Sequence, residues 1–158
     1  MRACEKEGSS PRRRVFREIV MKNSERDQSC RGRVEQFPLN YSSDDRGVLL
    51  PFDFHELPFA VQRTFLIDRV PRGVERGGHA HVNGAQYLVC LRGSVEVSCV
   101  DGKSVRVFQL QPLKSGLLIG AGIVSSQRFL GEDSLLLVFA STAFDQVEYF
   151  FPESPLGS

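Results

Sequence analysis

The amino-acid sequence predicts an all-β protein, built as an antiparallel sandwich or barrel. From residue 34 onward, short apolar runs rich in β-branched and aromatic residues alternate with turn residues, about every 8–12 positions. At one junction, Asp101-Gly102, apolar and polar residues alternate on both sides, which is the strongest local signal for a β-hairpin. We find no amphipathic helix longer than about two turns. Together these three observations favour strands throughout the domain.

The expected strands follow the apolar runs in chain order. They lie in residues 47–52, 60–70, 85–100, 103–110, 116–124 and 134–144. The run 85–100 is broken once, at Arg92-Gly93, and therefore supplies two strands. Other runs end at turn residues such as Pro71-Arg72-Gly73 and Gln111-Pro112.

Length and charge predict one domain with a separate basic tail. A chain of 158 residues with 41% hydrophobic and 25% charged residues suits a single globular domain with a sizeable core. The net charge of +1 argues against nucleic-acid binding by the whole chain. The basic residues gather in residues 1–33, where ten Lys and Arg face five Asp and Glu. We expect a disordered tail over 1–33, a domain over 34–152 and a short C-terminal tail over 153–158. A presequence or a nucleic-acid-binding arm is the alternative for the basic tail.

Cysteine usage and hydropathy predict a cytoplasmic protein. The four cysteines form no Cys-x-x-Cys pair, and Cys90 and Cys99 lie inside apolar runs, so we expect buried free thiols in a reducing compartment. No apolar run approaches the roughly 20 residues that span a membrane. The N-terminus lacks the hydrophobic region of a secretory signal.

The stretch "RGGHAH" carries the chemistry of this sequence. His79 and His81 stand one residue apart at the start of an expected strand, so both side chains point to the same face. Two imidazoles there can bind a metal, move protons or serve as hydrogen-bonded structural residues. Arg76 adds a cation beside them. The third histidine, His55, lies far upstream in "FDFHELPF".

The spacing around the two histidines resembles the first signature motif of the cupin superfamily, which forms a small jelly-roll barrel. The motif runs from Gly73 through His79, His81 and Gln86 to Gly93. Metal-binding cupins have a glutamate where this chain has Gln86, and a further histidine in a second motif that is missing here. Because a catalytic divalent metal normally needs three or more protein ligands, we expect no metal.

A closer resemblance is to the WxcM-like cupins, the sugar-nucleotide 3,4-ketoisomerases that act on dTDP-4-oxo-6-deoxyglucose. The matching stretches, in order, are "DDRGVLL", "LPFAVQRTFLI", "VPRGVERGGHAH", "QYLVCLRGSVEVSCVDG", "GLLIGAGIV" and "LLLVFASTAFDQVEY". The resemblance implies a jelly-roll barrel without metal or other cofactor, a homodimer and a dTDP-sugar substrate.

The same resemblance implies roles for particular residues. His79 and His81 would act as the catalytic acid–base pair. Arg63 and Gln86 match positions that line the cavity of the family, and Arg46 and Arg76 match arginines near it. The sequence therefore predicts an isomerase that removes the C3 hydrogen of a 4-oxo sugar, passes through an enediol and returns a proton at C4.

Several positions depart from the family pattern. Phe65 and Leu66 stand where hydroxyl-bearing residues are expected, Phe144 replaces a common tyrosine, and 124–126 replace an aromatic and polar cluster. These changes suggest a changed substrate, or a weakened or lost activity.

Three alternatives to the isomerase remain open. The first is a non-catalytic cupin that binds a sugar nucleotide or another small anion, and the second is a metal-dependent oxygenase or epimerase. The third is a metal-free 3,5-epimerase, which would need a tyrosine as acid. None of Tyr41, Tyr87 and Tyr149 is obviously placed for that role.

Overall fold

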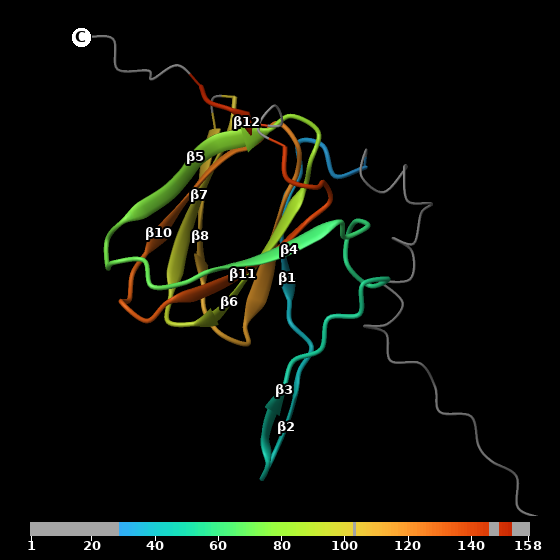
Figure 1. Cartoon of the computed structure of the whole chain (residues 1–158), viewed down its shortest axis with the longest axis vertical. Coiled ribbons are helices and arrows are strands. Elements are labelled where there is room, and N and C mark those ends of the chain that lie inside the picture. Colours follow the sequence, from blue (N-terminus) through green and yellow to red (C-terminus); the bar gives the residue numbers. More distant parts are fainter. Residues whose placement is uncertain (1–28, 103, 146–148, 153–158) are drawn as a thin grey trace, which may run out of the picture.

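The computed structural model describes residues 29–102, 104–145 and 149–152, and the regular secondary structure of this part of the chain is almost entirely strand. Two five-stranded antiparallel sheets face each other, and a separate two-stranded ribbon extends from them (Figure 1). The strands are β1 (Val34–Pro38), β2 (Ser42–Asp44), β3 (Gly47–Leu49), β4 (Arg63–Ile67), β5 (Glu75–His81), β6 (Gln86–Arg92), β7 (Val95–Asp101), β8 (Ser104–Leu110), β9 (Ser115–Ile119), β10 (Val124–Phe129), β11 (Leu135–Ala140) and β12 (Tyr149–Phe150). The all-β prediction is confirmed.

The two large sheets enclose the main hydrophobic core. The first sheet has the order β1-β9-β6-β11-β4, and the second sheet has the order β12-β5-β10-β7-β8. Apolar side chains alternate along β7, so that Val95, Val97 and Cys99 are buried while their neighbours are partly exposed. Leu88 from the first sheet and Phe129 from the second are buried in this core. The predicted hairpin at Asp101-Gly102 is present, joining β7 to β8.

The three middle strands of the first sheet, β9, β6 and β11, are buried on both faces. On the outer face of this sheet, Phe52, Leu57 and Phe59 cover Tyr87 and Phe139. This second core explains why β6 reads as a continuous apolar run, since side chains on both of its faces are out of water. Burial raises the pKa of Tyr87 to about 12, so this phenol stays protonated. Tyr87 belongs to the outer core and does not line the cavity described below.

The described cysteines are buried free thiols, as predicted. Cys30, Cys90 and Cys99 are all buried, and no disulfide joins any two of them. Burial is the main cause that raises the pKa of both the Cys90 and Cys99 thiols to about 11. Cys4 lies outside the described residues, as does most of the predicted basic tail. Residues 29–33 fall within the range predicted as tail, and they contact the barrel through Cys30 and through a backbone hydrogen bond from Gly32 to Ala121.

The ribbon of β2 and β3 stands apart from both sheets. Figure 1 shows it projecting below the barrel, and all six of its strand residues are exposed. Val48 and Leu49 expose 52% and 65% of their surface, so these two neighbouring apolar side chains are largely open to solvent within the single chain. An isolated two-stranded hairpin is only marginally stable in water, so this ribbon lacks the packing that a strand pair needs.

Among the described residues there is no helix long and apolar enough to cross a membrane.

Candidate active site

A cavity of about 400 Å³ lies between the two sheets. Both sheets contribute to its lining, which brings together residues that are up to 86 positions apart in sequence. The lining residues used below are Arg63, Phe65, Leu66, Ile67, Asp68, Arg76, Gly77, His79, Gln86, Leu88, Ser125, Gln127, Val138 and Tyr149. Four of the six residues predicted for the site, Arg63, Arg76, His79 and Gln86, therefore meet in one cavity.

The two histidines come from β5 and lie in mutual contact. The ring centroids of His79 and His81 are 5.2 Å apart, and the ring planes are inclined at 65°. Both side chains are half-buried, and His79 lines the cavity while His81 lies beside it. The prediction that they begin a strand is wrong, since β5 ends at His81. The alternation of the strand nevertheless places both side chains on one face, as predicted from the sequence.

Two glycines shape the backbone just before the histidines. Gly77 and Gly78 have φ angles of +88° and +75°, which side chains other than glycine rarely adopt. The pairing of β5 with β10 shifts register at Ser125/Ser126, opposite this segment. The register skips Gly78, so the irregularity falls directly before His79.

Tyr149 completes an aromatic cluster around the histidines. Its strand β12 pairs with β5, and the register places Tyr149 opposite His81. The Tyr149 ring centroid is 4.6 Å from that of His79 and 5.0 Å from that of His81. The ring of Phe151 also contacts His79, with centroids 5.5 Å apart. From the sequence, no tyrosine was obviously placed to act as an acid; the structure corrects this, since Tyr149 contacts both histidines. No local pattern reveals the contact, because β12 has only two residues.

Arg63 is held between two aromatic rings. Its guanidinium carbon lies 4.5 Å from the ring centroid of Phe65 and 4.9 Å from that of Phe144. These are cation–π contacts, which fix the direction of the guanidinium without using its N–H donors. The two phenylalanines noted as departures from the family pattern therefore act on the same arginine. Phe144 also contacts Tyr149, with ring centroids 6.1 Å apart.

Neutral polar groups line the second-sheet side of the cavity. Gln127 is buried, and its Nε2 donates a hydrogen bond of 3.2 Å to Oγ of buried Ser125. The hydrogen bond fixes the side-chain amide of Gln127 in the cavity wall. Sequence reasoning missed this pair, because the buried positions of β10 are polar and give only a weak strand pattern.

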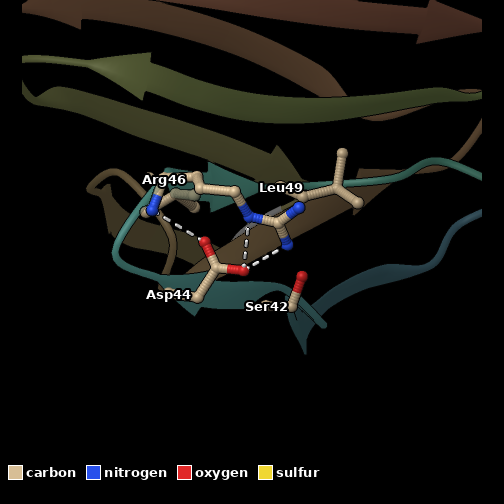
Figure 2. Close-up of a pocket in the computed structure, with 6 residues that line it drawn as sticks. Ser42, Asp44, Arg46 and Leu49 are labelled. Carbon is tan, nitrogen blue, oxygen red and sulfur yellow. Dashed lines mark hydrogen bonds and ion pairs between the residues drawn. The ribbon is translucent and has the colours of Figure 1, made fainter.

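Arg46 lies outside this cavity within the chain. It sits at the turn of the ribbon, where its backbone N donates a 2.9 Å hydrogen bond to Oδ1 of Asp44, and its Nε donates one of 3.1 Å to Oδ2 (Figure 2). The side-chain hydrogen bond from Arg46 lowers the pKa of the Asp44 carboxyl. A shallow hollow surrounds this pair, lined also by Ser42 and Leu49. The predicted substrate contact of Arg46 stays a prediction.

Within the described ranges, no three His, Cys, Asp or Glu side chains gather closely enough to hold a metal ion. The neighbours of the histidines are aromatic: the phenol ring of Tyr149 contacts both, and the ring of Phe151 contacts His79. The expectation of metal-free chemistry stays a prediction.

Two antiparallel sheets that enclose a small cavity with a His-x-His pair on one wall define a cupin-type barrel that receives a small molecule. Comparison with known proteins identifies the family. The family model described as FdtA, WxcM-like, C-terminal matches residues 33–153. The chain belongs to this family.

Relatives of known activity support this assignment. The chain is 31% identical over 107 residues to the TDP-4-oxo-6-deoxy-α-D-glucose-3,4-oxoisomerase of Aneurinibacillus thermoaerophilus, covering 67% of this chain and 77% of that protein. Two solved structures from Campylobacter jejuni share the fold. The first is the TDP-quinovose 3,4-ketoisomerase WlaRB, which is 30% identical with a TM-score of 0.69, and the match covers 73% of this chain and 90% of that chain. The second is the TDP-fucose-3,4-ketoisomerase WlaRA, which is 26% identical with a TM-score of 0.69, and the match covers 75% of this chain and 88% of that chain. The resemblance to the WxcM-like cupins is confirmed.

Proposed function

We propose that this protein is a TDP-sugar 3,4-ketoisomerase, which interconverts a TDP-4-oxo-6-deoxyhexose and its 3-oxo isomer. The observation that carries the proposal is the meeting of His79 with Arg63, Arg76 and Gln86 in one cavity, in a chain of this family. The cavity has the right chemistry for a substrate that is part anion and part uncharged sugar.

The reaction needs one base and one acid. The base removes the C3 hydrogen, which the neighbouring oxo group makes acidic, and the acid supplies a proton to C4 of the enediol. His79 lines the cavity and is the base in this proposal, and His81 contacts its ring and exchanges protons with the site. Imidazoles suit both tasks because their ordinary pKa lies near neutral pH.

The arginines and the amides supply binding. Arg63 and Arg76 hold the diphosphate as multiple N–H donors, and the ring contacts of Arg63 fix its guanidinium before the substrate arrives. Gln86 and Gln127 can each donate and accept hydrogen bonds, as sugar hydroxyls require. The contacts of the two arginines with the diphosphate hold the nucleotide, and the amides orient the sugar ring against the histidines.

A second candidate function is binding of a TDP-sugar without catalysis. The observation that favours it is the apolar lining at Phe65 and Leu66, and the phenylalanine at position 144, where the family pattern has hydroxyl groups. The two candidates share a ligand and differ only in turnover.

A proton NMR time course of the protein with TDP-4-oxo-6-deoxyglucose in D₂O separates the two candidates. An isomerase gives new 3-oxo signals and incorporates deuterium at C4. Broadened substrate lines without product identify a binding protein. Sharp, unchanged lines at a high protein concentration contradict both candidates.

Replacing Phe144 by leucine should raise KM for the TDP-sugar and leave kcat nearly unchanged. An exposed cation–π contact contributes about 0.5–1 kcal/mol, so its loss corresponds to a rise of about two- to fivefold. Steady-state kinetics check this expectation. Phe54→Leu is the matched control, because Phe54 is similarly exposed but contacts Phe139 rather than an arginine. A fall in kcat with unchanged KM would show that Phe144 acts on the histidine cluster instead.

The homodimer predicted from the sequence also belongs to this proposal. The exposed ribbon with Val48 and Leu49 has too little packing in a single chain, and a second copy of the chain supplies a surface for it. The ribbon would then carry Arg46 to the second copy. Sedimentation equilibrium should give a dimer, which Val48→Lys weakens. Val105→Lys, at a position of β8 that is slightly more exposed than Val48, should leave the dimer intact. A monomeric wild-type protein would contradict this part of the proposal.

A cytoplasmic location and the absence of a nucleic-acid partner, both predicted from composition, stay predictions.

A further inference from the structure

Apart from Asp68, the described groups of the cavity that can exchange a proton lie on one of its two walls. The second sheet supplies His79 and Tyr149, and His81 contacts both of them. The first sheet supplies apolar side chains such as Leu88 and Val138. The first sheet also adds two polar groups, Arg63 and Gln86. Neither exchanges a proton readily, because an arginine stays protonated and an amide does not ionise.

Asp68 is the one acid among the described lining residues, and it lies far from the histidines. It follows β4 and stands five residues after Arg63, so it lies about 16 Å away along the strand. Arg63 lies at the same end of the cavity as the histidines, because Phe144 contacts both Arg63 and Tyr149, and Tyr149 contacts His79. Asp68 is also engaged elsewhere: its Oδ1 accepts a 2.9 Å hydrogen bond from the backbone N of Arg69 and lies 3.5 Å from Nη2 of Arg92.

A pyranose ring that lies parallel to the two facing sheets turns one face toward each of them. In that orientation, a 4-oxo sugar has the proton carriers on one face and mostly apolar and non-exchanging groups on the other. The reaction breaks the C3–H bond, forms the C3=C4 bond of the enediolate, and then forms a C4–H bond as the hydroxyl proton passes from O3 to O4. Both C–H steps need a proton carrier within hydrogen-bond reach.

We propose that the sugar ring binds in this orientation, that the proton returns to C4 on the same face from which the C3 hydrogen leaves, and that the product therefore has an axial C4 hydroxyl. This inference rests on the proposed function. In 4-oxo-6-deoxyglucose, the C3 hydrogen lies on the ring face opposite the C5 methyl group. A hydrogen added to C4 on that face puts the new hydroxyl on the methyl side, which is the galacto configuration. The product is a TDP-3-oxo-6-deoxygalactose.

Family membership does not decide this point. WlaRB and WlaRA are named for quinovose and fucose, which are 6-deoxyglucose and 6-deoxygalactose and differ at C4. The distribution of proton carriers over the two walls is the evidence that belongs to this chain.

Trapping with borodeuteride reads the configuration and the isomerisation separately. The protein acts briefly on TDP-4-oxo-6-deoxyglucose in ordinary water, borodeuteride reduces the mixture, and proton NMR is recorded on the released sugars. Reduction of the product places deuterium at C3, whereas reduction of unreacted substrate places it at C4. Extrapolation to zero time, with His79→Asn as the background, removes uncatalysed epimerisation.

The expected result is C3-deuterated sugar with the small H4–H5 coupling of an equatorial C4 hydrogen. C3-deuterated sugar with a large H4–H5 coupling would overturn the same-face proposal and leave the isomerase intact. Deuterium at C4 alone, at the level of the background, would overturn the proposed function and this inference with it.

Discussion

Replacing either histidine of β5 by asparagine should lower kcat for TDP-4-oxo-6-deoxyglucose by about 10²–10⁴-fold, the usual contribution of a positioned acid or base. Asparagine keeps the size and a hydrogen-bonding group but cannot exchange a proton at neutral pH. The affinity for TDP should stay close to that of the parent protein, because the diphosphate is assigned to Arg63 and Arg76. Steady-state kinetics and TDP titration by calorimetry measure the two quantities.

The chain offers a matched control for this experiment. His55 is exposed in the segment that covers the first sheet, and His55→Asn removes an imidazole without touching the cavity. It should turn over like the parent protein. Full activity of both His79→Asn and His81→Asn would mean that the pair has a structural role, and the tyrosine beside it would become the first candidate for acid.

Gly77→Ala should destabilise the protein clearly more than Gly78→Ala. Both positions have a positive φ, which costs an alanine about 1–2 kcal/mol. At Gly77 an added Cβ would also lie 2.6 Å from the backbone O of Ser125 and 2.9 Å from Oε1 of Gln127, whereas at Gly78 nothing lies within 4 Å. Overpacking of this kind typically costs a further 1–3 kcal/mol or so.

Urea unfolding followed by circular dichroism gives the free energy of unfolding for the pair. Because both variants carry the same backbone strain, their difference isolates the contact with β10. In thermal unfolding, each kcal/mol corresponds to roughly 2–4 °C for a chain of this size. Equal free energies of unfolding for the two variants would show that β10 moves to accommodate the added Cβ, and that the bulge at Ser125/Ser126 deforms easily.

Much of the fold follows from local patterns in the sequence. The alternation around Asp101-Gly102 predicted β7 and β8, because one side of that hairpin faces the core and the other faces water. The run 116–124 was predicted as a strand, and the structure ends β9 at Ile119 and begins β10 only at Val124. The glycines between them form a turn, which an apolar run alone does not reveal. The ribbon of β2 and β3 gave little signal, since neither of its faces is buried.

The site was predicted in part for a similar physical reason. His79 and His81 are close in sequence, so strand alternation was enough to place them together. Tyr149 joins them only through the pairing of β12 with β5, across about 70 residues of chain. No local pattern encodes such a pairing. The contact between Arg63 and Phe144 is likewise long-range, and it gives a physical role to a residue that the sequence marked only as a departure from its family.

The unequal covering of the two sheets has a consequence for the motions of the protein. The first sheet has a hydrophobic core on each face, whereas the second sheet turns one face to water, where Val105 and Val107 are exposed. Amide hydrogens of β6 and β11 should therefore exchange with solvent only through global unfolding, and those of β5 and β12 through smaller, more frequent openings. The histidines sit on the sheet that is expected to open more readily. Any local opening that accompanies binding or release of a nucleotide sugar should therefore fall on the histidine-bearing sheet, while the doubly covered strands stay in place.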